Sequence, residues 1–331
     1  MTQFPTGTPS TTAQRWLHRI AIVLAVGTVL LIAKGGLVHS AGAGLSVPDW
    51  PTTYGENMFT FPVEKWTGGI VYEHGHRLLA SGIGMLMIVV AVMVWMVDRR
   101  RWLRWLSIAA LGAVIVQGVL GGITVLMQLP TAVSVSHAML AQSFMIATML
   151  IAAATARGWK QTKLPAPVSA DRGLQKLLLA TVVFTFVQIL LGAITRHTYS
   201  GPAIIDFPLN NGKVIPDFVN FGVAIQFAHR VGAMILSVLI FVQGIRILRN
   251  RELAVLRTPA LLAMIMVTVQ FLLGATVIWT REAIVPNTLH VMGGAMTFAV
   301  VFLTYARSVH FYRFSASRES AEHIQFQGIK A

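Results

Sequence analysis

Four histidines recur at one fixed interval along the chain, and imidazole is the commonest metal ligand in proteins. The same number of residues separates His76 from His229 and His137 from His290. Each lies near the start of a long apolar segment, where an ionisable side chain is costly and is therefore a functional candidate. Two imidazoles on facing helices can bind a haem iron from both sides of the porphyrin. The pattern predicts two haem sites, with one histidine pair in each half.

Polar side chains beside the histidines indicate what each site can do. Arg77 and Arg230 directly follow the first histidine of each pair, and arginine can bind haem propionates or, alternatively, lipid headgroups. Glu73 precedes His76 by one helical turn, whereas the corresponding residue of the second half is Gln226. A buried carboxyl can act as an acid, a base or a charge stabiliser, or it can simply pair with Arg77. The difference between Glu73 and Gln226 predicts a catalytic site in the first half and a site of passive electron transfer in the second.

A purely structural role or a bare metal ion is the alternative for these histidines. A single buried histidine is ordinarily a hydrogen-bonded structural residue, but four in a repeated pattern favour ligands. Zinc needs three or four protein ligands, and the absence of cysteine excludes thiolate ligands, disulfides and iron–sulfur clusters. We expect the other histidines to be interfacial or solvated, although those near the outer ends can contact acidic groups of a ligand. They are His39, His74 and His197 at the outer ends, and His18, His310 and His323 on the other side.

The elements that carry these residues are predicted to be membrane-spanning helices. The chain has 331 residues, 55% hydrophobic and only 11% charged, whereas soluble domains carry about 25% charged residues. A spanning helix needs about 20 apolar residues, and the backbone in lipid must satisfy its own hydrogen bonds. The runs are continuous and do not alternate as β-barrel strands do. The eight predicted spans are 20–38, 74–97, 105–127, 134–156, 176–195, 220–245, 259–279 and 286–307.

Internal similarity extends from the histidines to whole segments. Gln117–Thr124 resembles Gln270–Thr276, and Gln188–Thr195 is a further copy that aligns loosely with Ala33–Val38. We therefore expect an all-α integral membrane fold, built as two tandem four-helix bundles related by pseudo-two-fold symmetry. The first repeat, 1–163, would carry the first haem site, and the second, 164–331, would carry the other.

The charge distribution predicts orientation and excludes one class of partner. The net charge is +14, and most of the 26 lysines and arginines lie in loops on the side of the N-terminus. Such loops are usually cytoplasmic, so both termini are expected in the cytoplasm of a bacterium, with the chain in its plasma membrane. Two long loops, 39–73 and 196–219, are expected on the outer side. Nucleic acid is not an expected partner, because no basic stripe lies on a soluble module.

Several of these residues together resemble one known family. Glu73-His-Gly-His76-Arg77 matches the Glu-x-x-His-Arg pattern of haem A synthases, and residues 42–51 contain their Gly-Leu-Ser-Val-Pro-Asp-Trp-Pro segment. With the duplicated eight-helix plan, the resemblance covers residues 15–310. It implies a membrane oxidoreductase that converts haem O to haem A for cytochrome oxidases. The C8 methyl of the porphyrin would be oxidised to a formyl group through a hydroxymethyl intermediate.

The resemblance also implies a role for each site residue. His76 and His137 would hold the substrate haem, with Glu73 as the catalytic carboxylate, and His229 and His290 would bind haem b. The farnesyl tail of haem O would lie among lipid-facing helices. The implied partners are haem O synthase, the cytochrome oxidase assembly machinery and the lipid bilayer, and a homo-oligomer is a further expectation. Some family members carry a cysteine pair in the first outer loop, and any thiol step proposed for them cannot operate here.

Two other functions share part of the pattern. A di-haem b-type cytochrome that passes electrons from quinol would have the same histidine pairs but would not need Glu73. A duplicated transporter would share the repeat, but the purified protein would be colourless. Both remain alternatives at the level of sequence.

Overall fold

The computed structural model describes residues 11–161, 166–168 and 172–314, and eight of its helices are long and apolar enough to span a membrane. This confirms the predicted all-α membrane fold and the number of spans. The first four long helices are α1 (Thr12–Ser40), α2 (Gly69–Val97), α3 (Arg101–Leu126) and α4 (Thr131–Thr155). The other four are α6 (Arg172–His197), α7 (Phe221–Arg249), α8 (Ala254–Trp279) and α9 (Ile284–Phe311).

The helices extend beyond the apolar runs that predicted them. For example, α1 begins at Thr12 because Thr11 and Gln14 form a capping box, in which each side chain bonds to the backbone of the other. The polar first turns of α1 therefore continue the helix past its apolar run. Such extra turns are consistent with helices that leave the hydrocarbon region before they end.

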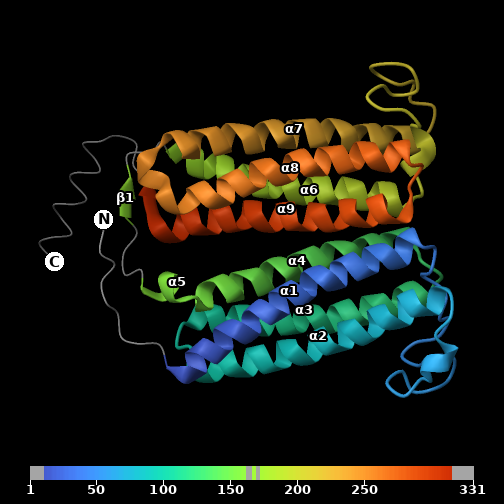
Figure 1. Cartoon of the computed structure of the whole chain (residues 1–331), viewed down its shortest axis with the longest axis horizontal. Coiled ribbons are helices and arrows are strands. Elements are labelled where there is room, and N and C mark those ends of the chain that lie inside the picture. Colours follow the sequence, from blue (N-terminus) through green and yellow to red (C-terminus); the bar gives the residue numbers. More distant parts are fainter. Residues whose placement is uncertain (1–10, 162–165, 169–171, 315–331) are drawn as a thin grey trace, which may run out of the picture.

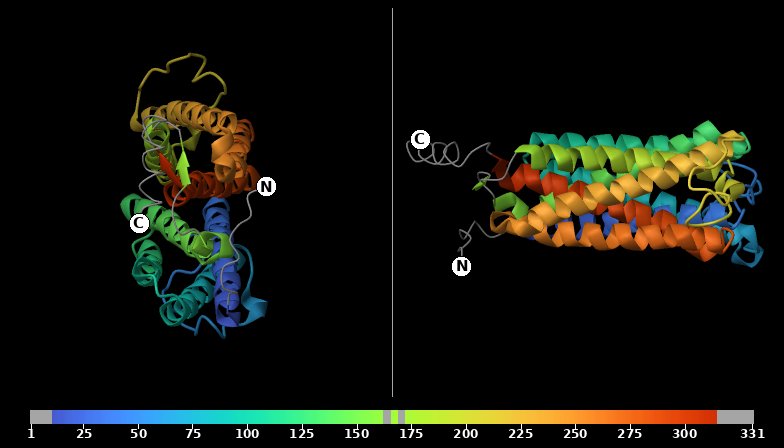
Figure 2. Two further views of the ribbon diagram at one scale, coloured as in Figure 1. Left: turned by 90° about the vertical axis from the view of Figure 1, so that its left-hand side faces the viewer. Right: turned by 90° about the horizontal axis from the view of Figure 1, so that it is seen from above.

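The long helices form two groups of four that lie side by side (Figure 1). In the first group, α1 to α4 pack together, and α6 to α9 form the second group (Figure 2). Across the junction, α1 packs on α9, and α4 packs on both α6 and α9. The outer walls are thus α2 and α3 on one side, and α7 and α8 on the other. The pseudo-two-fold axis stays a prediction.

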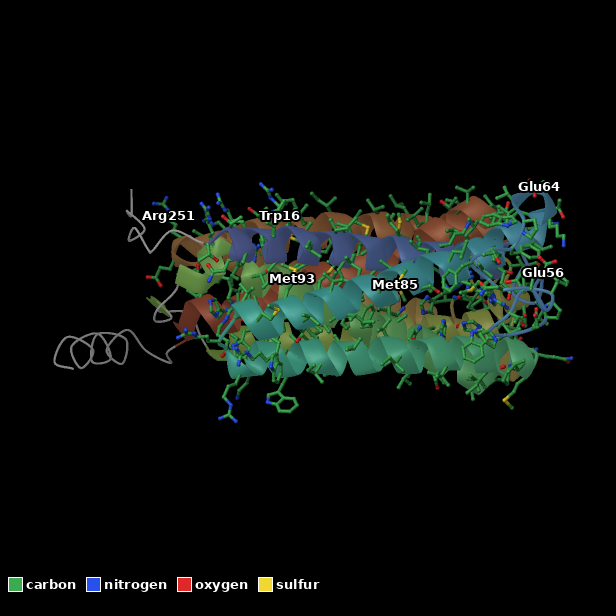
Figure 3. All side chains as sticks on the ribbon, turned by 90° about the horizontal axis from the view of Figure 1, so that it is seen from below. Trp16, Glu56, Glu64, Met85, Met93 and Arg251 are labelled. Atoms are coloured by element: carbon green, nitrogen blue, oxygen red, sulfur yellow. The ribbon has the colours of Figure 1, made fainter. Side chains whose placement is uncertain are left out.

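Short helices and strands lie at the two ends of the bundle. We name the end that carries Trp16 and Arg251 the inner end, and the end that carries Glu56 and Glu64 the outer end (Figure 3). The outer loops contain two 3-10 turns, Val63–Lys65 and Gly201–Ala203. At the inner end lie a third 3-10 turn (Arg251–Leu253), α5 (Arg157–Gln161), and the strands β1 (Ala166–Val168) and β2 (Tyr312–Phe314), which pair in parallel.

Two histidines expected to be solvated or interfacial are instead half-buried structural residues at the inner end. The Nδ1 atom of His18 lies 3.1 Å from the carbonyl oxygen of Ala152. The Nε2 atom of His310 lies 2.9 Å from the carbonyl oxygen of Trp159, and the two rings stack. His323 lies outside the described residues. The sequence analysis did not assign a functional site to any of these three histidines.

The apolar core is dense toward the inner end and hollow toward the outer end. Leu17, Met87, Leu103 and Ile151 are fully buried in one cluster of the first bundle. A second cluster, which includes Ile240, fills the middle of the other bundle. Toward the outer end, large apolar side chains give way to histidines, glycines and glutamines that surround a cavity.

Candidate functional site

All four repeated histidines line one cavity of about 1340 Å³ in the outer part of the bundle. Pockets for a single drug-sized molecule usually measure roughly 300–1,000 Å³, so this space is larger than one such ligand needs. His76 and His137 stand within about two turns of the outer starts of α2 and α4. His229 and His290 have the same placement on α7 and α9. The predicted common depth of the four side chains is confirmed.

His229 and His290 face each other at a separation that suits an iron between them. Their ring centroids lie 6.4 Å apart, and the ring planes cross at 83°. Two metal–nitrogen bonds of about 2.0 Å, plus about 1.2 Å from each nitrogen to its ring centre, also give a separation of about 6.4 Å. The second pair therefore fits a haem iron bound from both sides. His76 and His137 line the same cavity, and the Nδ1 atom of each is buried without a partner among the described residues.

Each of the four imidazoles lies against a glycine of the preceding long helix. A Cβ atom added to Gly192 would stand 2.9 Å from Cε1 of His229, and one added to Gly35 would stand 3.0 Å from Cε1 of His76. The same contact joins Gly121 to His137 at 3.3 Å and Gly274 to His290 at 3.1 Å. These glycines let an imidazole edge lie directly on the neighbouring backbone, where a Cβ would push it away.

A glutamine one turn before the glycine holds three of the four histidines. The Nε2 atom of Gln188 donates to the carbonyl oxygen of His229 at 2.8 Å and lies 3.0 Å from its Nδ1. Gln270 makes the same two contacts with His290, at 2.6 and 3.0 Å. The bond to each backbone carbonyl ties the histidine's helix to the preceding long helix, and the amide beside Nδ1 limits how the ring can turn. The Gln-x-x-x-Gly pattern is the sequence signal that could have revealed these residues.

The first histidine pair, His76 and His137, has fewer glutamine partners than the second pair. Gln117 donates to the carbonyl oxygen of His137 at 2.9 Å, but Leu31 stands one turn before Gly35, where a glutamine would face His76. The glycine contacts give the register of the loose alignment of the first helices, because Gly35 is the structural counterpart of Gly192. His76 is therefore the one histidine of the four without a glutamine partner.

Glu73 lines the cavity and is bonded through both of its carboxylate oxygens. Oε2 accepts from the backbone N–H of Val47 at 2.8 Å, and Oε1 accepts from Nη2 of Arg77 at 2.6 Å. Both side chains of this ion pair are buried. The pairing with Arg77 is thus real, and it leaves Glu73 as an acidic group beside the first histidine pair.

Gln226 performs the same structural task in the second half without a charge. Its Oε1 accepts from the backbone N–H of Ile204 at 2.6 Å, and its Nε2 donates to the carbonyl oxygen of Gly201 at 2.8 Å. Glu73 and Gln226 therefore both attach an outer loop to the start of a helix. Only the first can carry a negative charge or a proton at that position.

The two arginines hold the outer loops over the cavity. Arg77 donates to the carbonyl oxygens of Val47, Asp49 and Thr52 at 2.8, 2.7 and 3.1 Å. Arg230 donates in the same way, and its acceptors are the carbonyl oxygens of Ile204, Asp206 and Leu209. Because loop carbonyls engage the two terminal nitrogens of each guanidinium, binding of propionates by Arg77 or Arg230 stays a prediction.

An aspartate turn closes each loop. The Asp206 carboxylate accepts from the backbone N–H groups of Gly212 and Asn211 at 2.7 and 2.6 Å, and these bonds lower its pKa. Asp49 accepts from the N–H groups of Gly55 and Tyr54, both at 2.8 Å. Burial opposes ionisation of Asp49, but its hydrogen bonds prevail and lower the pKa. The two loops are thus built alike, and each carries an aspartate, an aromatic residue and a proline in succession.

Three further outer-end side chains occupy the junction of the two bundles. The half-buried Arg196 donates to the carbonyl oxygen of Gly36 at 2.6 Å and to Oδ1 of Asn287 at 3.1 Å, joining α6 to α1 and α9. The rings of His39 and His197 meet edge to face, with centroids 4.9 Å apart. All three line the cavity. Sequence reasoning did not single out Arg196, because only the folded bundles bring its partners together.

His74 is a structural residue of the first outer loop. It is fully buried, its Nδ1 lies 3.1 Å from Oγ1 of Thr53, and its ring packs between Phe61 and Trp66. It is not among the residues that line the cavity. His74, two residues before His76 in the chain, thus anchors the loop and faces away from the site.

Fold and site together define a polytopic membrane protein with two histidine pairs on one cavity. The chain belongs to the cytochrome oxidase assembly protein family, whose model matches residues 18–302. It is 30% identical to haem A synthase of Shouchella clausii over 271 residues, which cover 81% of this chain and 88% of that protein. The corresponding identity with haem A synthase of Alkalihalophilus pseudofirmus is 26%, over 82% of this chain and 90% of that protein. Haem A synthase of Rhizobium etli is 28% identical, over 85% and 88%.

Proposed function

We propose that this chain converts haem O to haem A by oxidising the C8 methyl group of the porphyrin to a formyl group. Family membership and the similarity to haem A synthases support this activity. The observation that carries it here is a difference in charge between two sites built on the same plan. Glu73 stands beside the first histidine pair, where the second half has the neutral Gln226.

Within this proposal the first pair binds the substrate. His76 and His137 would hold the haem O iron, and the iron would supply the redox chemistry when the substrate is bound. Glu73 would take or stabilise charge at the adjacent porphyrin edge, because it lines the same cavity and is acidic. The missing glutamine beside His76 supports this assignment, since a ligand with fewer outer contacts releases its haem more readily. A substrate site must release its product, whereas a cofactor site need not.

The second pair binds a resident haem b in this proposal. The ring separation of 6.4 Å, the two glycine contacts and the two glutamines form a complete and symmetric setting for a bis-histidine haem. The shared cavity connects this site to the first through the junction residues His39, Arg196 and His197. Electrons could then pass between the haems inside one chain. The division into repeats 1–163 and 164–331 follows the two sites.

The proposal also covers the location of the protein and its partners. The multi-pass fold places it in a membrane, and its relatives come from bacteria. We propose the bacterial plasma membrane, with both termini in the cytoplasm as the basic inner loops indicate. Haem O synthase would deliver the substrate, and the cytochrome oxidase assembly machinery would receive the product. A homo-oligomer stays an expectation.

The decisive experiment is to supply haem O to the purified protein with a source of reducing equivalents and oxidant. Extraction and chromatography of the haems should then show haem A. A protein that retains two haems but yields no haem A, under conditions where a related synthase is active, would favour the di-haem cytochrome. A protein that binds no haem would favour the transporter.

A further inference from the structure

The two halves differ in how far the cavity reaches between their outer helices. In the second half, the lining residues of α7 and α8 end at Ser237 and Val267. In the first half, the cavity continues past the corresponding positions to Ile88 on α2 and Leu111 on α3. That extension is about one helical turn, or roughly 5 Å. The first site therefore has a slot between α2 and α3, and the second site has no counterpart.

Two glycines make room for this slot. Gly84 and Gly118 line it, and a Cβ atom added to either would meet nothing within 4 Å. The second half has Ser237 and Phe271 at the corresponding positions. The ring of Phe271 packs on Phe207, with centroids 5.7 Å apart. An aromatic side chain thus stands where the first half is open.

The slot opens on the lipid-facing surface of the bundle. Ile88 and Ile115 line it, yet 51% and 61% of their surfaces are exposed, so the cavity reaches the outside between them. α2 and α3 form the wall of the first bundle that faces away from α6 to α9 (Figure 1). At its other end, the slot is continuous with the space around His76, whose Nδ1 is buried and has no hydrogen-bond partner in the part of the chain that the structure describes. Its walls are formed mainly by apolar side chains and glycines, so it suits a hydrocarbon chain.

We propose that this slot between α2 and α3 holds the isoprenoid chain of the substrate porphyrin and selects for porphyrins that carry one. The inference rests on the proposed function, in which the first site takes haem O and the second takes haem b. Haem O has a long hydrocarbon substituent, and haem b has none. The slot lies at the site that needs it, and the second site has Phe271 where the slot has Gly118. In a bilayer the chain leaves lipid and not water when it enters the slot, so selection rests on van der Waals packing and on the room that the slot gives it.

The test compares the binding of two porphyrins at the first site. The full-length protein, with haem b already bound in the second half, is titrated with haem O and separately with protohaem, and binding is followed by the Soret band. Gly118→Phe copies the residue of the second half. We expect it to weaken haem O binding by at least about tenfold and to leave protohaem binding within about twofold. Val116→Phe is the matched control, because Val116 lies on the same helix, is exposed and does not line the cavity.

Other outcomes would contradict the proposal that the slot holds the isoprenoid chain. Equal weakening for both porphyrins would mean that Gly118→Phe disturbs the whole site, and unchanged haem O binding would mean that the chain lies elsewhere. A slot that normally holds only a lipid acyl chain would give this second result. Gly84→Leu, on the opposite wall, repeats the test if Gly118→Phe does not retain haem b. If the unaltered protein makes no haem A, the proposed function fails; if it does and both variants discriminate normally, only the slot fails.

Discussion

Arg77 lies 2.6 Å from Glu73, and the two side chains bind the same residue of the first outer loop, Val47, through its carbonyl oxygen and its N–H. The carboxylate is therefore fixed in direction before any ligand binds. A fixed charge beside the first histidine pair needs no reorganisation during a reaction. In the proposed function, Glu73 would combine loop anchoring with acid–base chemistry.

Replacement of Glu73 by glutamine should separate these two roles. The amide oxygen can still accept from Val47, as that of Gln226 does from Ile204, so folding and haem binding should persist. Formation of the formyl group should fall by about 10²-fold or more, as for loss of a catalytic acid or base. Haem chromatography measures this. The matched control, Gln226→Glu, should keep activity, and full turnover by Glu73→Gln would remove the catalytic role.

Replacement of His229 or His290 by alanine should abolish stable haem b binding. Each imidazole supplies one of the two iron ligands in the proposed second site, and the rings lie at the separation that iron needs. Haem b per protein is measured by the pyridine haemochrome spectrum. His18→Ala is the control, because His18 is hydrogen-bonded at the inner end. Full haem b content in both variants would refute the assigned pair.

A methyl group on Gly192 should loosen haem b. The added Cβ would stand 2.9 Å from Cε1 of His229, so either the imidazole or α6 must move. Overpacking of this kind costs about 1–3 kcal/mol, which corresponds to weaker haem b binding by roughly fivefold or more. Gly112→Ala serves as the control, since its Cβ would meet nothing within 4 Å. Haem transfer to apomyoglobin would report the rate of loss, which should rise only for Gly192→Ala.

Glutamine at position 31 should make the first site retain its haem more firmly. Leu31 occupies the position from which Gln188 reaches His229 in the other half. An amide there can orient His76, and outer contacts of this type change metal affinity by about 10–100-fold. We expect more haem at the first site after purification, together with slower product release. Leu30→Gln, at an exposed neighbouring position, should do neither; equal retention in the two variants would contradict the glutamine's role.

Acidification should release the second outer loop. Hydrogen bonds from Gly212 and Asn211 lower the pKa of Asp206, so ionised Asp206 stabilises the loop above the ordinary aspartate pKa. That contribution declines as the pH falls through the lowered pKa of the folded protein. The protection factors of residues 204–214, which compare hydrogen exchange with the intrinsic rate at each pH, should therefore fall between about pH 5 and pH 2. Asp206→Asn should show lower protection already at pH 7, and its protection should depend less on pH in that window.

Local sequence patterns determined the spans and the repeated histidines. Eight apolar runs predicted eight spanning helices because a backbone in lipid can satisfy its hydrogen bonds only within a helix or a closed barrel. The fixed interval between His76 and His229 placed both near the outer start of a helix. The contrast of Glu73 with Gln226 was likewise visible in the chain itself. Each of these features follows from the order of residues along the chain and does not depend on which side chains meet.

Tertiary structure decided which groups meet. The contact of Gly192 with His229, the bonds of Arg77 to the outer loop and the junction formed by Arg196 all join different elements. So does the slot at Gly118, because a glycine in an apolar helix predicts no cavity until its neighbours are known. Pairing across helices depends on rotation and packing, which apolar periodicity leaves free in a bilayer where most faces are hydrophobic. The sequence therefore predicted the candidate iron-binding histidines, and the packing of the helices determined what surrounds them.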